Sequence, residues 1–256
     1  MVNPLSYLEV LGTGVVAGAV NTIAGAGSLL TFPVLVAVGL PPLAANITND
    51  IGVVPGNLTG TVALRAGLKD SGRLLKITVP LTVAGSIAGA ALLLLAPARA
   101  FEIAAPVLLL AASVLTALQP RLVRLTQRAG RERRGWLCAT ITAIAVYGGY
   151  FGTGIGVLFI AVLGLFVRED LSRLNALKTL LQLLANGIAG VLFVIVAHVY
   201  WPVTVVLALG TTIGGPLGAR LARRIPARTL RQVICVVGVA ASGYLFWQRL
   251  LTVTGL

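Results

Sequence analysis

Amide and ionisable side chains recur along two otherwise apolar stretches of the sequence. The first stretch carries Asn46, Asn49, Asp50 and Asn57. On a helix that turns ~100 degrees per residue, these positions fall within about 100 degrees of one another and form one face. Polar groups in a membrane helix are costly unless they face other helices or a water-filled cavity. We expect this face to contact a polar solute, although an isolated asparagine would more readily be explained as a hydrogen bond to a neighbouring helix.

The second stretch repeats this pattern and adds a positive charge. Its polar residues are Asn175, Lys178, Thr179, Gln182 and Asn186. An ammonium group on the same face as the amides would attract an anion. Lys178 could instead extend from its helix end toward the membrane surface, and the sequence leaves both interpretations open. Because the polar stripe occurs twice, we favour a binding role for it.

Two of the amides are expected deep in the membrane. Asn57 and Asn186 each lie 11 residues beyond the first asparagine of their stripe, which is ~16 Å along a helix. This spacing places them near the midplane. Asp50 is the one acidic residue in either stripe, and it argues against an anion path unless it is protonated or couples transport to protons.

Glycine-rich breaks supply a second kind of binding group. They read Gly25-Ala26-Gly27-Ser28 and Gly152-Thr153-Gly154-Ile155-Gly156. Each precedes a new apolar segment, whose first N–H groups and positive dipole end would point inward and suit an anion. The alternative for such glycines is close helix packing. We expect packing to explain four others, which are Gly85, Gly89, Gly214 and Gly218.

The elements that position these residues belong to a multi-pass membrane protein. The chain has 256 residues, of which 57% are hydrophobic and 11% charged, against about 25% charged in soluble domains. Five uncharged stretches are each long enough to cross a bilayer, for which about 18 residues suffice: 10–49, 77–98, 103–120, 135–167 and 179–219. The net charge of +13 lies in the short loops between them. This distribution favours the positive-inside bias over nucleic-acid binding.

The chain contains an internal duplication. At an offset of 129 residues, Asn46 aligns with Asn175 and Asn57 with Asn186, and both Gly-x-Gly breaks coincide. We therefore divide the chain into a first repeat (1–120), a basic cytoplasmic linker (121–135) and a second repeat (136–256). Each repeat is predicted to hold a broken hairpin and three further helices. The predicted segments are 5–24, 28–39, 45–66, 74–96 and 101–118, then 136–152, 155–167, 174–197, 202–222 and 230–249.

Loop charges predict that the repeats are inverted relative to each other. The 65–76 loop is basic while its counterpart at 198–202 is uncharged, and the 97–102 loop is nearly neutral while its counterpart at 220–231 is basic. If basic loops are cytoplasmic, both termini lie outside. Inverted repeats with broken helices are characteristic of secondary transporters that alternate access around a central site.

At these positions the sequence resembles the sulfite exporter TauE/SafE family, also called the TSUP permeases. The first-copy pattern runs Gly18-x-x-Asn21-x-x-Ala24-Gly25-x-Gly27-Ser28, followed by Gly39-Leu40-Pro41-Pro42 and Ala45-Asn46-x-Thr48-Asn49. The second-copy pattern includes Gly148-Gly149-Tyr150-Phe151-Gly152-x-Gly154-x-Gly156 and Asn175-Ala176-Leu177-Lys178. Ala26 departs from the third glycine of many relatives. The resemblance implies an inner-membrane permease without an ATPase domain that moves sulfite, sulfonates or related small anions, and it adds Asn21 to the candidate site.

Other functions remain as alternatives. An enzyme is disfavoured because the chain has one His and two distant Cys, with no catalytic spacing. A permease or channel for a carboxylate or metal ion, and a membrane assembly protein, stay possible. We expect no metal site because the stripes lack a His, Cys or carboxylate cluster, and we expect no cofactor. The sequence is compatible with a homo-oligomer.

Overall fold

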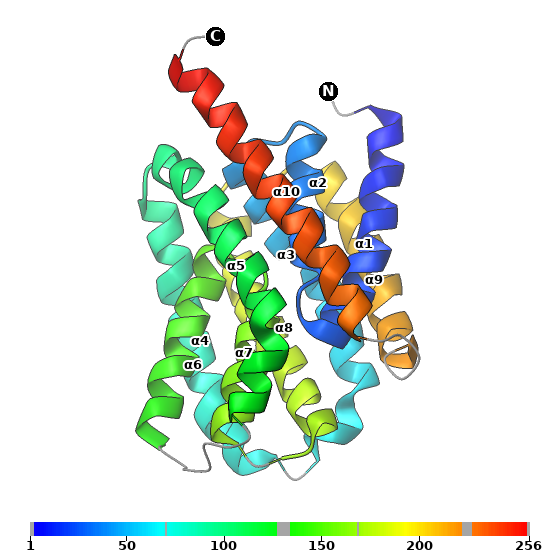
Figure 1. Cartoon of the computed structure of the whole chain (residues 1–256), viewed down its shortest axis with the longest axis vertical. Helices are drawn as coiled ribbons and strands as arrows, with labels where there is room; N and C mark the ends of the chain where they lie inside the picture. The colour runs from blue at the N-terminus through cyan, green and yellow to red at the C-terminus, as the bar shows by residue number, and fades with distance from the viewer. Residues whose placement is uncertain (1–2, 70, 127–133, 168, 222–226, 255–256) are drawn as a thin grey trace.

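The structure is a computed structural model that describes residues 3–69, 71–126, 134–167, 169–221 and 227–254, with side chains omitted for 120–126, 227–231 and 248–254. These residues form helices throughout (Figure 1). The first half contains α1 (Pro4–Ala24), α2 (Ser28–Ala37), α3 (Pro42–Ala63), the short η1 (Arg65–Leu68), α4 (Gly72–Leu95) and α5 (Ala98–Thr126). The second contains α6 (Arg134–Tyr150), α7 (Ile155–Phe166), α8 (Leu171–Val196), α9 (Trp201–Leu221) and α10 (Ala227–Thr254). The predicted all-α membrane fold is confirmed.

Five helices among the described residues are long and apolar enough to cross a membrane. They are α1, α4, α5 over Ala98–Gln119, α8 and α9. α3 has 22 residues and would span ~33 Å, but its polar stripe lowers its hydropathy. α2 and α7 have 10 and 12 residues, so each is too short to cross alone and returns from a break inside the bundle.

The outer surface of the bundle is apolar. Leu95 is 85% exposed, Ile195 73% and Val236 69%. A soluble monomer rarely exposes so much contiguous apolar surface, whereas lipid tails cover it at no cost. The helical backbone satisfies its own hydrogen bonds, as a membrane span requires.

Helices from the two sequence halves interleave. α1 packs most extensively on α9, and α4 on α6, so each outer helix pair joins opposite halves. The helices form a first bundle of α1, α2, α3, α9 and α10 and a second bundle of α4, α5, α6, α7 and α8. In Figure 1, α4, α5 and α6 lie on the left and α1 and α9 on the right. The bundles meet where α3 crosses α8 and α5 crosses α10.

Small residues allow the closest of these contacts. A Cβ atom added to Gly218 would lie 2.4 Å from the Ala19 carbonyl oxygen, and one on Gly89 would lie 2.0 Å from that of Val146. Gly85 faces α6 and Gly214 faces α1 in the same way. The prediction that these four glycines serve helix packing is confirmed, and the packing joins α1 to α9 and α4 to α6.

Corresponding helices start at corresponding positions. Pro42 and Leu171 begin α3 and α8, Gly72 and Trp201 begin α4 and α9, and α5 and α10 begin at 98 and 227, each pair 129 residues apart. Both termini lie at the same end of the molecule in Figure 1. Residues 127–133 of the predicted basic linker (121–135) lie outside the described residues, as do Arg223 and Arg224.

Candidate functional site

The two glycine breaks meet each other inside the molecule. A Cβ atom on Gly25 would lie 2.7 Å from the Gly156 Cα, and one on Gly156 would lie 2.6 Å from the Gly25 Cα. Neither position could carry a side chain without moving the opposite backbone. The breaks of the two halves therefore form one structural centre.

Each break depends on a left-handed glycine. Gly25 has φ +76° and ends α1, and Gly154 has the same φ and precedes α7. This conformation penalises a Cβ atom. In the first break, the Gly27 N–H donates to the Asn21 side-chain oxygen at 2.6 Å. Asn21 thus fixes the geometry of the first break.

The first break also contacts the second through a hydroxyl. The Gly154 N–H donates to the Ser28 Oγ at 3.1 Å. Ser28 is the first residue of α2 and is buried. The N-terminal ends of α2 and α7 therefore lie next to each other.

The asparagines that begin the polar stripes each bind the broken helix of the other half. Asn46 on α3 donates its Nδ2 to the Tyr150 carbonyl oxygen at 3.2 Å, at the end of α6. Asn175 on α8 donates to the Thr22 carbonyl oxygen at 3.1 Å, in the last turn of α1. These carbonyls lack partners within their own helix, so both amides have a structural role.

Lys178 lies fully buried at the first break. Its Nζ donates to the carbonyl oxygens of Asn21 at 2.8 Å and Thr22 at 3.3 Å. A cation is favourable at the carbonyl end of a helix. Lys178 therefore does not extend to the membrane surface, and the inward orientation, one of the two possibilities left open by the sequence, is correct.

Asp50 lies fully buried at the second break. Its Oδ1 lies 2.1 Å from the position of a Gly152 Cβ, so only glycine fits there. Both carboxyl oxygens are without a hydrogen-bond partner. No ion pair joins Asp50 to Lys178, although both side chains are described.

The crossing of α3 and α8 holds further amides without partners. A Cβ on Gly60 would lie 3.5 Å from the Thr179 methyl, and one on Gly190 would lie 3.5 Å from Ile51. The helices are therefore antiparallel. Asn57 precedes Gly60 by three residues and Gln182 follows Thr179 by three, so Asn57 and Gln182 lie at the same level. Both side-chain atoms of Asn57, and the side-chain oxygens of Gln182 and Asn186, are buried and have no partner.

The predicted residues thus lie in one buried region, but in different environments. Asn21, Ser28, Asn46 and Asn175 hold the breaks in place. Asn49 accepts a hydrogen bond from the Thr31 hydroxyl, while its Nδ2 has no partner. The structure adds Gln182, Gly152 and Thr31 to the region. Gln182 belongs to the sequence stripe, whereas Thr31 has no sequence signal beyond its place after a break.

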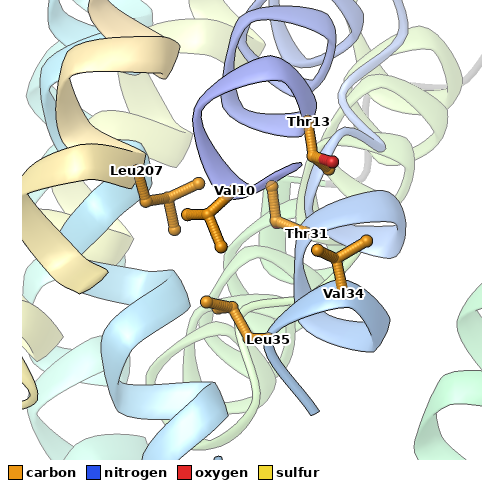
Figure 2. A pocket seen from close by; sticks show the side chains of 6 residues that line it. All are labelled: Val10, Thr13, Thr31, Val34, Leu35 and Leu207. Carbon is orange, nitrogen blue, oxygen red and sulfur yellow. The ribbon is translucent and has the colours of Figure 1, made fainter. Parts of the chain in front are cut away.

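A hollow lies beside this region, between α1, α2 and α9 (Figure 2). Its walls are formed by Val10, Thr13, Thr31, Val34, Leu35 and Leu207. It has about 120 Å³ of empty space, part of which is open to the outside. The walls are mostly apolar, so the hollow is a packing defect and not the binding site.

The described residues contain no group of three His, Cys, Asp or Glu side chains that could hold a metal ion. The donors in this region are amides, hydroxyls, one ammonium and one carboxyl. Such a set can bind an oxyanion or a hydrated solute through hydrogen bonds, because its buried polar atoms lack protein partners.

Comparison with known proteins is consistent with this arrangement. A family model described as sulfite exporter TauE/SafE matches residues 10–245. The chain is 27% identical over 252 residues to a probable membrane transporter protein, YfcA, of Escherichia coli strain K12, covering 97% of this chain and 92% of the relative. It is 25% identical over 226 residues to a probable membrane transporter protein, ORF9, of a Sinorhizobium species, covering 88% and 86%.

A third relative is a probable membrane transporter protein of Haemophilus influenzae, 23% identical over 239 residues, which cover 92% of both chains. No solved structure matches the chain. The family model covers most of the sequence, including both breaks and both stripes. The chain therefore belongs to the sulfite exporter TauE/SafE family of membrane transporters.

Proposed function

We propose that this chain is a secondary permease for small sulfur oxyanions, such as sulfite or a sulfonate. The observation that carries the proposal is the buried ammonium of Lys178 beside the glycine breaks. An ammonium has three N–H donors, and two of them reach the Asn21 and Thr22 carbonyls. The third remains for an anion.

The neighbouring groups suit an oxyanion. The N-terminal ends of α2 and α7 meet at Ser28 and Gly154, and helix N-termini favour negative charge. Asn57, Gln182 and Asn186 lie at the α3–α8 crossing with buried atoms that have no partner. Among these atoms the Asn57 Nδ2 is a donor from which a bound anion would accept a hydrogen bond. The unpartnered atoms of Gln182 and Asn186 are side-chain oxygens, which would accept from a water molecule or from a protonated substrate.

Alternating access would then use the two bundles as moving units. Rocking of the sequence halves would separate α1 from α9 and α4 from α6, which are the most extensive contacts in the molecule. Rocking of the first bundle against the second would keep those contacts and change the α3–α8 and α5–α10 crossings, together with the smaller contacts between the two glycine breaks. The central site lies on that boundary.

Inverted repeats in the inner membrane are part of the proposal. The starts of α4 and α6 lie at the end of the molecule opposite the termini in Figure 1. In the sequence, Arg73 and Arg134 belong to these starts, and Arg65 and Lys69 shortly precede α4. Positive loops favour the cytoplasm, so the termini would lie outside. Asp50 would couple transport to a cation, and the proton is the candidate that the sequence suggested.

The test is a thermal-shift panel on purified protein with sulfite, thiosulfate, sulfoacetate, taurine, sulfate, lactate and divalent metals. We expect a sulfur oxyanion to stabilise the wild-type protein and to lose its effect on Lys178→Met. Lys76→Met is the matched control, because Lys76 is exposed at the start of α4. Stabilisation only by lactate or metals would reject the sulfur oxyanion assignment.

A further inference from the structure

The C-terminal ends of the two broken helices, α1 and α6, differ in the ionisable side chain that lies beside them. At the end of α1, the Asn21 and Thr22 carbonyl oxygens receive the Lys178 ammonium. This cation compensates the negative end of the helix dipole. The first break therefore has a lysine side chain at its carbonyl end.

The end of α6 lacks that charge. The residue aligned with Lys178 is Asn49, which is neutral, accepts from Thr31 and has an Nδ2 without a partner. The next residue along α3 is Asp50, whose counterpart is Thr179. The second break thus combines a negative helix end with a carboxyl group, and the described side chains place no cation beside them.

The oxygen atoms at this break are arranged along one side of α3. Asn46 and Asp50 are four residues apart and so share a face. Asn46 reaches Tyr150 through its Nδ2 and leaves its Oδ1 buried without a partner. Asp50 lies against Gly152 with both carboxyl oxygens unpartnered. Tyr147 cannot serve as that partner, because its hydroxyl donates to the Thr153 carbonyl at 2.8 Å.

We propose that a sodium ion binds at the second break, held by the Asp50 carboxylate, the Asn46 Oδ1 and backbone carbonyls of residues 150–152. It would compensate the negative dipole at the C-terminal end of α6, as the Lys178 ammonium does at the end of α1. Carboxylate, amide and carbonyl oxygens are the ligands of hard cations, and unwound helix ends coordinate sodium in transporters of inverted design. An exchangeable ion at one break, opposite a fixed ammonium at the other, would be the coupling ion of the proposed permease.

The test measures thermal unfolding of the purified protein in sodium, potassium or choline chloride at equal ionic strength, without substrate. We expect sodium to raise the Tm of the wild-type protein by an amount on the order of 5 °C at saturation. Asp50→Asn should lose this response. Glu9→Gln, which removes an exposed carboxylate outside the site, should keep it.

A second variant places a lysine ammonium at the second break. Asn49→Lys places an ammonium at the position aligned with Lys178, and it should no longer respond to sodium. If Asp50→Asn or Asn49→Lys does not fold, calorimetric titration of the wild-type protein with sodium chloride against choline chloride decides the question, with saturable heat expected for sodium alone.

Three results would overturn the sodium site: no sodium response in the wild-type protein, the same response in Asp50→Asn, or a Tm that changes with pH but not with sodium. The last would assign a proton to Asp50. Because no substrate anion is present and chloride is the same in every salt, failure here leaves the anion proposal untouched, and failure of the anion panel leaves the sodium result untouched.

Discussion

The Lys178 ammonium on α8 lies 2.8 Å from the Asn21 carbonyl oxygen in α1, so a residue of one sequence half caps the broken helix of the other. This contact places a lysine side chain inside the bundle, at the point where the two glycine breaks meet. Its geometry leads to the first prediction.

Removing the ammonium should weaken anion transport far more than removing a surface lysine. We expect Lys178→Met to lower uptake at subsaturating substrate by roughly 30- to 100-fold, since a hydrogen bond to a charged group contributes about 2–3 kcal/mol. Lys178→Arg should retain part of the activity because it keeps the charge. Uptake of labelled sulfite into proteoliposomes measures both, with Lys76→Met as the control. Wild-type uptake by Lys178→Met would exclude an anion-binding role.

Substitutions of Asn57 and Asn175 should distinguish a substrate-binding amide from an amide that stabilises the fold. Asn57 has no hydrogen-bond partner, whereas Asn175 donates to the Thr22 carbonyl. We expect Asn57→Leu to keep or raise stability, because it leaves no protein group unpaired, and to reduce substrate affinity by about 10-fold. Asn175→Leu should instead lose about 0.5–1.5 kcal/mol of stability, because it removes one hydrogen bond from the Thr22 carbonyl and leaves only the longer bond from Lys178.

Paired thermal unfolding and ligand titration on the two variants provide the comparison. If Asn57→Leu lowered stability as much as Asn175→Leu while binding substrate normally, Asn57 would be a helix-packing residue and not a ligand.

The contact between the breaks should not tolerate a methyl group. Gly156→Ala would place a Cβ 2.6 Å from the Gly25 Cα and 2.4 Å from the Gln182 side-chain oxygen. Overpacking of this kind costs about 1–3 kcal/mol, so we expect a lower Tm and impaired transport. Gly12→Ala is the control, because nothing lies within 4 Å of its Cβ and alanine favours a helix by up to about 1 kcal/mol. Equal Tm values for the two variants would contradict this close approach.

The charge distribution predicts which loops face the cytoplasm. In a background with Cys138 and Cys235 changed to serine, we expect Lys69→Cys to react with an impermeant maleimide only after the cells are permeabilised. His198→Cys should react in intact cells. Both positions are exposed and lie in opposite loops of the fold. The reverse labelling pattern would invert the proposed orientation.

A cross-link between the bundles should stop transport. Ile51 on α3 lies within 3.7 Å of a Cβ placed on Gly190 of α8, close enough for a cysteine pair to form a disulfide. We expect oxidation of Ile51→Cys/Gly190→Cys to abolish flux and reduction to restore it, with each single variant unaffected. Full flux through the oxidised protein would mean that the α3–α8 crossing does not move.

Much of the fold could be read from the sequence because membrane helices follow local rules. Uncharged stretches of sufficient length predict spans without reference to neighbours. The predicted segments match the observed helices within a few residues, apart from α5 and α10, which continue to Thr126 and Thr254. The breaks at Gly25 and Gly154 were also predictable, since glycine takes the left-handed conformation that each chain reversal requires.

The polar stripes could be predicted from the sequence only in part. Helical periodicity places Asn46 and Asn57 on one face, and both are buried. Periodicity cannot tell which partner an amide meets, so the sequence did not distinguish Asn46, which caps α6, from Asn57, which has no partner. The direction of Lys178 was undecided for the same reason.

The sequence alone determined a membrane-embedded helical chain with a repeated polar stripe and two glycine breaks, because hydropathy, helical period and glycine conformation are local properties. Only the tertiary structure decided that α9 packs on α1 and α6 on α4, that Gly25 meets Gly156, and that Lys178 and Asp50 occupy different breaks. These relationships join residues far apart in the sequence, and they depend on which small-residue surfaces fit together in three dimensions.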